Sequence, residues 1–241
     1  MIYLFTDFGL HDWYVGQMRA VLARQAPMVP VIDLMHGVAP FDVQAGAYLL
    51  GALAAQLPEG SITVGVVDPG VGGPRRPLMM ESDGRWFVGP DNGLFAPVWR
   101  RAQTRRAYRI DWKPETLSTS FHGRDLFAPV AAMLAVGQRP AATEVSDPIE
   151  PAGWPDDLWR VIHIDRYGNA VTGIQGSTVR DDTVLEARGR RFAFAPTFSA
   201  GPPSTPFWYR NSIGLVELAA AAVSVSANGA LALDDKVIKS Q

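Results

Sequence analysis

Acidic side chains follow several short apolar runs that are typical of buried strands, and they are the first candidates for chemistry. In chain order they are Asp7, Asp33 with His36 nearby, Asp68, and Asp91 with Asn92. Parallel α/β sheets bind ligands beyond the carboxyl ends of their strands. One such Asp is usually a turn or capping residue, but several at successive strand ends would line one crevice. Carboxylates crowded in this way need a cation, sugar hydroxyls or arginines nearby to stay ionised.

The loop from Asp68 to Arg76 is rich in glycine and proline. It lacks the Gly-Lys-Ser/Thr and G-x-G-x-x-G patterns of phosphate-binding loops, and no helical pattern follows it directly. It is therefore either a tight turn between strands or a loop whose glycines let the backbone approach a ligand. In the second case Arg75 would fold back on Asp68 as an ion pair.

A histidine stands at the start of a predicted helix, in the segment Phe121-His122-Gly123-Arg124-Asp125. Asp125 is most simply an acid favoured by the helix dipole. The chain has four histidines and no cysteine, and it has no H-x-x-x-H spacing, so a multi-histidine or thiolate metal site is not expected. The G-x-S-x-G pattern of a serine nucleophile on an elbow turn is also missing.

Two later segments combine polar and aromatic side chains. They are 164–169 (Ile-Asp-Arg-Tyr-Gly-Asn) and 207–212 (Phe-Trp-Tyr-Arg-Asn-Ser). Gly168-Asn169 is by itself a turn signal, and aromatic clusters more often belong to a core. Polar residues inside an aromatic cluster nevertheless indicate a pocket wall, which could hydrogen-bond to a purine and stack on it.

Alternating strand and helix patterns in the first part of the chain predict βαβ units and a mostly parallel α/β sheet domain over 1–145. The predicted strands are 2–6, 29–35, 61–67, 78–81, 86–89 and 108–111. The first predicted helix is capped by Asp12 and ended by Pro27, and the later ones span 43–57, 94–102 and 125–136.

Proline-rich residues 139–157 predict a linker. The strand patterns beyond it are short, at 158–164, 170–174, 183–187, 191–195, 223–225 and 230–233. The last two flank the Asn228-Gly229 turn signal. These patterns predict a small β-rich second domain over 157–241, a barrel or a sandwich.

Composition limits the class of protein. The chain has 241 residues, 47% of them apolar, and a net charge of −2. Near-neutral charge argues against a nucleic-acid partner. No apolar run is long enough to span a membrane, and the N-terminus lacks the basic region of a signal peptide. The sequence therefore predicts a cytoplasmic protein with a small-molecule ligand, without nucleic-acid or membrane partners.

Several segments occur together in a fixed order. In the first domain they are Thr-Asp-Phe-Gly-Leu-His-Asp (6–12) with Tyr-Val-Gly (14–16), Pro-Phe-Asp-Val-Gln-Ala-Gly (40–46), Val-Asp-Pro-Gly-Val-Gly-Gly (67–73) with Arg75, Gly-Pro-Asp-Asn-Gly (89–93) and Phe-His-Gly-Arg-Asp (121–125). In the second they are Ile-Asp (164–165), Tyr-Gly-Asn (167–169) and Asn-Ser-Ile-Gly (211–214) with Glu217. Together they resemble one family, the S-adenosyl-L-methionine (SAM) hydroxide adenosyltransferases, relatives of fluorinase and chlorinase.

The resemblance implies an N-terminal α/β domain, a C-terminal β-barrel and a homotrimer. The ligand would lie between the N-domain of one subunit and the C-domain of its neighbour. Hydrolytic members carry a set that matches Asp68, Arg75 and His122, which would be the catalytic residues here. Halogenating members lack that set and have an extra loop in the N-domain that this sequence does not contain.

The resemblance also implies substrate-binding roles. Asp7 would hold the ribose hydroxyls with Phe41 packed nearby, Asp165 and Ser212 would bind the methionine end, Asn169 would bind adenine and Phe198 would stack on it. The other matching positions are Asp12, Asp91, Asn92, Phe121, Tyr167, Asn211 and Glu217. One departure is Ile213, where halogenating relatives have arginine. SAM is then the substrate, and neither a cofactor nor a metal is expected.

The expected reaction is hydrolysis of SAM to adenosine and L-methionine by in-line attack of water at C5′. Asp68 would accept the proton of the water, Arg75 would keep Asp68 ionised and ordered, and His122 would orient the water. Three alternatives remain open. They are a non-catalytic adenosine- or SAM-binding module, a metal-dependent hydrolase that uses Asp7, Asp68, Asp91 and His122, and halide transfer to C5′.

Overall fold

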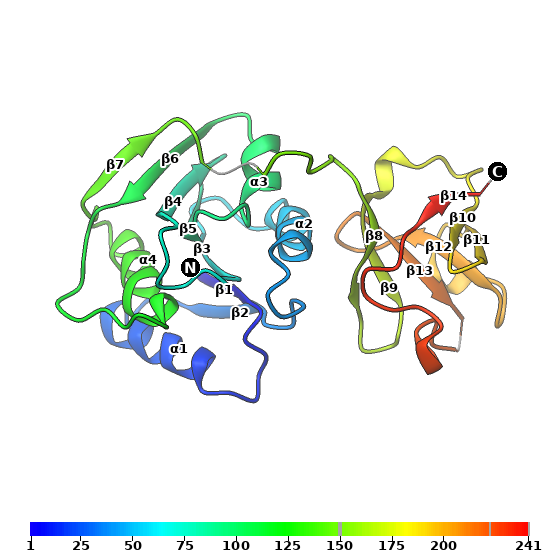
Figure 1. Ribbon diagram of the computed structural model, residues 1–241, viewed down its shortest axis with the longest axis horizontal. Helices are drawn as coiled ribbons and strands as arrows, with labels where there is room; N and C mark the ends of the chain where they lie inside the picture. Colours follow the sequence, from blue (N-terminus) through cyan, green and yellow to red (C-terminus); the bar gives the residue numbers. More distant parts are fainter. Residues whose placement is uncertain (149–150, 222, 241) are drawn as a thin grey trace. The chain divides into compact units, whose positions relative to one another are not determined.

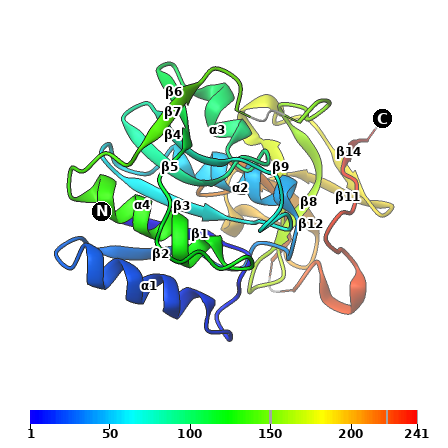
Figure 2. The same cartoon turned by 60° about the vertical axis from the view of Figure 1, so that its left-hand side comes forward.

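The computed structural model describes residues 1–148, 151–221 and 223–240. The chain divides into two compact units, Met1–Ala152 and Gly153–Gln241. Each unit is built around a seven-stranded sheet of its own (Figures 1 and 2). In the described part of the chain, no helix has both the length and the apolar composition that crossing a membrane requires.

The first unit alternates strands and helices around a sheet with the strand order β2-β1-β3-β5-β4-β6-β7. Its elements are β1 (Ile2–Thr6), α1 (Tyr14–Gln25), β2 (Val31–Met35), α2 (Val43–Ala54), β3 (Ile62–Val66), β4 (Pro77–Ser82), β5 (Arg85–Pro90), α3 (Ala96–Arg101), β6 (Arg105–Ile110), a π-helical turn (Gly123–Phe127), α4 (Ala128–Ala135) and β7 (Ala142–Val145). The α/β class predicted from the sequence is confirmed.

The sheet of this unit is mixed rather than mostly parallel. β1 runs parallel to β2 and β3, and β3 runs parallel to β5. The pairs β4–β5, β4–β6 and β6–β7 are antiparallel. The change of direction has a local cause, because Asp83 and Gly84 join β4 to β5 with φ of 46° and 73°. Two successive residues of positive φ make the two-residue turn that favours an antiparallel hairpin.

The helices cover the sheet in two pairs. α1 and α4 contact each other, and α4 also contacts β1 and β3, while α2 packs with α3 (Figure 1). The five residues of β1 and the five of β3 are all buried, which explains why both appear in the sequence as continuous apolar runs. Helix α1 begins after Trp13, and no side chain caps it. The predicted cap by Asp12 is therefore wrong.

The predicted linker over 139–157 is partly wrong as well, because it contains β7, which pairs with β6. Residues 149 and 150 of that segment lie outside the described residues. The helix predicted over 125–136 is found as the π-helical turn followed by α4.

The second unit contains the strands β8 (Leu158–Ile164), β9 (Ala170–Gln175), β10 (Leu185–Ala187), β11 (Arg190–Phe194), β12 (Pro206–Arg210), β13 (Leu215–Ala220) and β14 (Ile238–Lys239). Short 3₁₀ turns lie at Gly176–Thr178, Phe198–Ala200 and Ala227–Gly229. The strand order is β14-β10-β11-β12-β13-β9-β8, and all neighbours are antiparallel except β11 and β12. Trp208, Phe192 and Leu218 are buried in its core.

The two edges of this sheet also approach each other. The backbone N–H of Val161 in β8 donates to the carbonyl of Asp235 at 2.9 Å, and that of Val237 donates to Trp159 at 3.0 Å. Strands predicted at 223–225 and 230–233 are not found, because residues 227–229 form a 3₁₀ turn and not a hairpin. Residue 222 and Gln241, the end of the second predicted domain, lie outside the described residues.

Candidate active site

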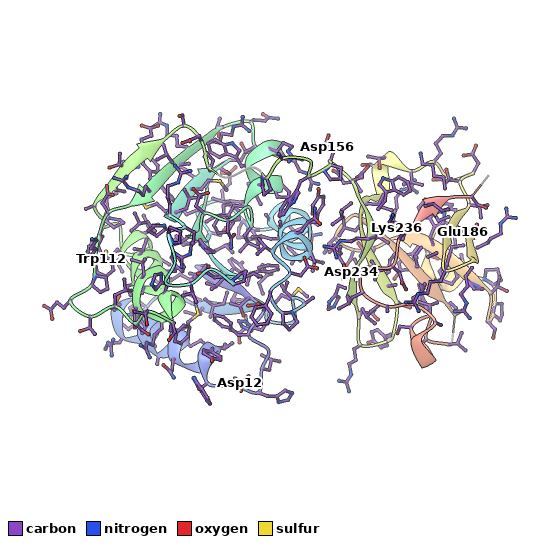
Figure 3. All side chains as sticks on the ribbon, in the orientation of Figure 1. Asp12, Trp112, Asp156, Glu186, Asp234 and Lys236 are labelled. Carbon is purple, nitrogen blue, oxygen red and sulfur yellow. The ribbon has the colours of Figure 1, made fainter. Side chains whose placement is uncertain are left out.

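A cavity of about 290 Å³ lies at the carboxyl ends of β1 and β3 in the first unit. We call it the first cavity. It is lined by Asp7, Phe8, Asp12, Tyr14, Phe41, Val66, Asp68, Val71, Ser120, Phe121, His122 and Gly123. Because Thr6 pairs with Val66 across the two strands, the loops that carry Asp7 and Asp68 leave the sheet side by side. Six residues predicted from the sequence thus come together here, with Asp12 on the loop between β1 and α1 (Figure 3).

Asp68, Arg75 and His122 form one hydrogen-bonded cluster at this cavity. Arg75 Nε donates to Asp68 Oδ1 at 3.0 Å and to Oδ2 at 3.1 Å, and Nη2 makes a further hydrogen bond to Oδ2. The same Nη2 lies 2.9 Å from His122 Nδ1. The side chains of Arg75 and Asp68 are only 9% and 4% exposed. Arg75 therefore holds the carboxylate and the imidazole in a fixed relation, largely shielded from bulk water.

The hydrogen bond from Arg75 also fixes the state of His122. A guanidinium donates hydrogen bonds and accepts none, so His122 Nδ1 must be unprotonated and the proton of the neutral ring is on Nε2. The electrostatics agree. Burial lowers the pKa of His122 and the charge of Arg75 lowers it further, against the opposing effects of Asp68 and Asp125. His122 is thus neutral at pH 7 and has an Nε2–H to donate.

Asp7 lies in the same cavity. The backbone N–H of Phe41 donates to Asp7 Oδ2 at 2.9 Å. Burial raises the pKa of Asp7, and the neighbouring charge of Asp68 adds to the rise, while the hydrogen bond from Phe41 opposes it. Phe41 itself has a φ of 65° and is 71% exposed. A left-handed backbone conformation is uncommon for a bulky residue and marks local strain at this turn.

Two local features hold the loop of Asp68 against the segment of His122. Gly72 has a φ of 77°, and a Cβ there would lie 2.3 Å from the carbonyl oxygen of Thr119, so only glycine allows this close approach. The π-helical turn that follows His122 places the Phe127 ring under the Arg75 guanidinium, with 5.3 Å to the ring centroid. Single π turns inside helices are frequent at functional sites.

Asp125 is not a simple helix-dipole acid. Arg124 Nε and Nη2 bind its two carboxylate oxygens at 2.6 and 2.9 Å, and the backbone N–H of Ser118 donates to it at 2.9 Å. The hydrogen bond from Arg124 is the main reason that the pKa of Asp125 is lowered. Asp125 therefore fastens the segment before His122 to the π-helical turn.

Asp91 and Asn92 are predicted to bind substrate, but neither lines the first cavity. Arg76 Nε binds Asp91 Oδ2 at 2.7 Å, and the Asp91 side chain is only 1% exposed. Asn92 Nδ2 donates to the carbonyl of Val67 at 2.8 Å, directly before Asp68. The geometry gives Asn92 a positioning role for the strand end that carries Asp68.

Asp33 and His36 also lie outside the lining of the first cavity. The Nδ1 atom of buried His36 is 2.7 Å from Thr6 Oγ1, and its Nε2 is 3.3 Å from Asp33 Oδ1 without the alignment of a hydrogen bond. Arg19 pairs with Asp33 at 2.6 Å. The acidic strand ends therefore do not all meet in one crevice.

The second unit contains a larger cavity of about 790 Å³, which we call the second cavity. It is lined by Asp165, Tyr167, Asn169, Phe198, Tyr209, Asn211, Ser212, Glu217, Ala220, Val223 and Ser224. All seven residues that the sequence analysis predicted in this unit are among them. They come from the β8–β9 loop, the turn at Phe198–Ala200, the loop between β12 and β13, and β13 itself.

Hydrogen bonds preorganise the carboxylates of this cavity. Asp165 Oδ1 accepts the backbone N–H groups of Tyr167 and Asn169 at 2.9 and 2.8 Å, and its Oδ2 accepts Asn169 Nδ2 at 3.0 Å. Glu217, which is 6% exposed, accepts hydrogen bonds from the Tyr209 hydroxyl and from Asn211 Nδ2, the latter at 2.9 Å. The polar groups of this wall are thus fixed before any ligand arrives.

Tyr209 is a lining residue that the set of predicted positions does not include. Burial raises the pKa of its hydroxyl, and the hydrogen bond to Glu217 raises it further. Burial lowers the pKa of the nearby His163, against the charges of Asp165 and Glu217. The signal for Tyr209 was its place in the aromatic and polar segment 207–212, where alternate residues of a strand share a face. Phe8 and Tyr14 lie within segments that carry the family resemblance but were not predicted to line a cavity. Ser120 and Ser224 were missed without a signal in the sequence.

No group of three His, Asp or Glu side chains that could hold a metal ion is formed by the described residues.

Comparison with known proteins places the chain in a family. The model of the SAM hydroxide adenosyltransferase N-terminal domain matches residues 2–144, and that of the C-terminal domain matches residues 159–238. This chain belongs to the SAM hydroxide adenosyltransferase family. The match covers both units and so includes both cavities.

Individual relatives support this family assignment. The chain is 40% identical to an "(R)-S-adenosyl-L-methionine hydrolase" of Thermus thermophilus over 90% of this chain and 91% of the relative. It is 35% identical to a protein of the same name in Salinispora arenicola over 95% of this chain and 90% of the relative. A fluorinase of Nocardia brasiliensis is more distant, at 25% identity over 94% and 92%.

Two solved structures are similar. A conserved protein of Thermotoga maritima, titled as uncharacterized, matches with a TM-score of 0.89 and 28% identity over the full length of both chains. A conserved hypothetical protein of Thermus thermophilus matches with a TM-score of 0.76 and 36% identity over 99% of both chains.

Proposed function

We propose that this protein is a SAM hydrolase, which converts SAM and water to adenosine, L-methionine and a proton. The observation that carries the proposal is the Arg75 guanidinium, which binds Asp68 and His122 at one cavity. The names of its relatives support the substrate, because proteins that are 35–40% identical over most of the chain are called (R)-SAM hydrolases.

The cluster can place one water molecule for attack. Asp68 lines the cavity and can supply an acceptor oxygen, and the neutral His122 can supply the Nε2–H donor. An acceptor and a donor together fix both the position and the orientation of a water molecule, which lowers the entropic barrier to in-line attack. As the O–C5′ bond forms, Asp68 accepts the proton of the water. General-base assistance of this kind contributes about 10²–10⁴-fold.

The charges of the reaction suit a hydrolase. The C5′–S electron pair goes to sulfur, so the cationic sulfonium becomes a neutral thioether and needs no general acid. Asp7, Asp12 and Asp68 line the first cavity, and their negative charge favours a cationic substrate. It disfavours a halide as nucleophile, since an anion would have to approach like charges. Water meets no such barrier.

The substrate-binding roles follow from the two linings. Asp7, held by the backbone of Phe41, is placed to accept the ribose hydroxyls. In the second cavity, Asn169 and the aromatic residues Phe198 and Tyr209 suit a purine, while Asp165 and Ser212 suit the amino-acid end. Asp12, Phe121, Tyr167, Asn211 and Glu217 complete the linings. Asp91 and Asn92 are proposed to support Asp68 from behind and not to contact the substrate.

The assembly is a further part of the proposal. We infer a homotrimer in which each site joins the N-domain of one subunit and the C-domain of the next. The exposed apolar side chains that line each cavity support it: Phe41 in the first, and Tyr167 and Phe198 in the second.

The domains are proposed as 1–145 and 157–241. The second is proposed as a small barrel because hydrogen bonds join β8 to the segment before β14. A cytoplasmic location stays a prediction from the sequence.

The test is an isotope-labelled hydrolysis. Purified protein is incubated with SAM in H₂¹⁸O, with a chelator present and halide absent, and the products are separated and weighed by mass spectrometry. We expect adenosine and methionine in equal amounts, with ¹⁸O in adenosine and none in methionine. Label in a methionine-derived product, or no cleavage, would overturn the proposal.

The same assay separates the alternatives. A binding module would leave SAM intact and bound, as calorimetry would show. A metal-dependent hydrolase would be active without the chelator and inactive with it. A halogenase would form 5′-chloro-adenosine when chloride is added. Loss of adenosine formation in Asp68→Asn, with protein that still binds SAM, would assign the activity to this site.

A further inference from the structure

Both cavities are lined by negatively charged side chains. Their linings contain five carboxylates, namely Asp7, Asp12 and Asp68 in the first and Asp165 and Glu217 in the second. Among the described lining residues, neither cavity has a lysine or an arginine. An anionic group of a ligand would therefore find no cation among these side chains to pair with.

Of the arginines nearest along the chain, Arg166 lies between the lining residues Asp165 and Tyr167, but it is exposed and does not line the second cavity. Arg75 and Arg210 are held by other groups. Arg75 binds Asp68 and His122. Arg210 follows the lining residue Tyr209 in β12, and its guanidinium binds the carbonyls of Gly176 and Val179 at 2.8 Å each and Asp181 at 2.6 Å. Because successive residues of a strand point to opposite faces, Arg210 is directed away from the second cavity.

The carboxylates of the second cavity are themselves satisfied. Asp165 is bound by backbone N–H groups and Asn169, and Glu217 is bound by Tyr209 and Asn211. These donors are neutral, so the two negative charges remain. A fixed negative field favours the ammonium and sulfonium groups of SAM and repels the carboxylate of the methionine part.

We propose, on the basis of the hydrolase function above, that this enzyme recognises adenosyl sulfonium cations as a class and does not require the amino-acid carboxylate. Sulfonium nucleosides whose side chain ends in an amine alone are then substrates comparable to SAM. Their cleavage follows the same balance: water adds at C5′, the C5′–S electron pair goes to sulfur, and the proton goes to Asp68. The products are adenosine and a thioether amine.

The test compares SAM with decarboxylated SAM, S-adenosyl-3-methylthiopropylamine, on the intact protein. Adenosine formation gives kcat/KM for each, and calorimetry gives each Kd. We expect kcat/KM for the decarboxylated compound to be at least one-third of that for SAM. A smaller value would show that the carboxylate is recognised and would overturn the inference.

The test also distinguishes failure of the proposed hydrolase function from failure of this inference. If neither compound yields adenosine, the hydrolase proposal is wrong, and the ratio of the two Kd values decides the inference by the same threshold. If SAM is hydrolysed and the decarboxylated compound is rejected, the hydrolase proposal stands and the inference is wrong.

A pair of variants tests the physical cause. Val223 lines the second cavity and is 48% exposed, so a longer side chain can be accommodated there. Val223→Lys adds a cation, and Val223→Met adds similar length without charge. We expect the preference for SAM over the decarboxylated compound to rise at least fivefold in Val223→Lys relative to Val223→Met. An equal preference in the two variants would contradict the electrostatic explanation.

Discussion

The two cavities organise their polar groups in different ways. In the first, charged side chains bind one another, as Arg75 does with Asp68 and His122. In the second, a carboxylate is held by backbone N–H groups, as Asp165 is, or by neutral side chains, as Glu217 is. The volumes differ too, about 290 against 790 Å³.

Under the proposed function, this difference separates chemistry from binding. A cluster in which one guanidinium fixes both an acceptor and a donor suits the positioning of a small reactant such as water. A wide wall of preorganised polar and aromatic groups suits the binding of the rest of a nucleoside. Substitutions in the first cavity should therefore lower kcat, and those in the second should raise KM.

The largest effect is expected for Asp68→Asn. The amide keeps the size of the side chain but cannot accept a proton from water, so kcat should fall about 10²–10⁴-fold with KM nearly unchanged. Steady-state kinetics with SAM measures both. Asp111→Asn is the matched control, since Asp111 lies outside both cavities and is held by Arg109 and Thr143. Unchanged kcat with a raised KM would show that Asp68 only binds substrate.

Gly72→Ala should come next, through displacement of the Asp68 loop. The added Cβ would lie 2.3 Å from the Thr119 carbonyl oxygen, so the loop must move away from the segment of His122. Misplacement by about 1 Å can cost about 10²-fold in rate, and we expect kcat to fall by that order.

Gly137→Ala is a close control for this change. Gly137 has the same φ of 77°, but a Cβ there meets nothing within 4 Å. Both variants should lose the roughly 1–2 kcal/mol that a left-handed conformation costs an L residue, measured by thermal unfolding. Only Gly72→Ala should lose activity. Equal loss in both would mean that the contact with Thr119 does not position the loop.

Much of this difference between the cavities could be predicted from the sequence, because it depends on residues that lie close together along the chain. The Gly/Pro-rich loop indicated that Arg75 could fold back on Asp68, and segment 207–212 indicated a pocket wall. His122 was assigned through the family resemblance alone, since it lies 47 residues from Arg75 and no local pattern reports such a contact.

Other features were not predictable in this way. Apolar runs identify strands but give no direction, so the antiparallel part of the first sheet was missed although the Asp83-Gly84 turn determines it. Strand β13 was missed because periodicity alone cannot distinguish an apolar run such as Leu215–Ala220 from a buried helix segment. Strand β12 was missed because its aromatic residues were interpreted as a pocket wall. Asn92 was predicted to bind substrate for a similar reason, since the sequence does not show which way a residue at a strand end projects. Here the Asn92 side chain points back and donates to the Val67 carbonyl.

A pH profile sharpens the role assigned to His122. Burial and Arg75 lower its pKa, so the ring is neutral at pH 7 and becomes protonated only below the ordinary value of about 6.5. Protonation of Nδ1 removes the acceptor of Arg75, and kcat should then fall by up to about tenfold per pH unit. His122→Asn keeps an acceptor near Nδ1 and cannot titrate, so this acid limb should disappear. An unchanged limb would assign it to a group other than His122, such as Asp7, whose pKa burial raises.

The smallest effect is expected in the second cavity, for Tyr209→Phe. The ring that forms the wall stays, and the buried Glu217 loses one of its two side-chain donors. A lost hydrogen bond of this kind costs about 1 kcal/mol, so KM for SAM should rise roughly fivefold while kcat stays within a factor of about two. Tyr108→Phe, the same change on β6 outside both cavities, is the control and should alter neither constant.

An alkaline titration tests the same residue without substrate. Burial and Glu217 raise the pKa of Tyr209, so its phenol should ionise later than an ordinary tyrosine, whose pKa is about 10. The absorbance of the phenolate near 295 nm should therefore lose a late-titrating group in Tyr209→Phe. If Tyr209→Phe lowered kcat more than it raised KM, the second cavity would take part in the chemical step. The division between a reacting cavity and a binding cavity would then be wrong.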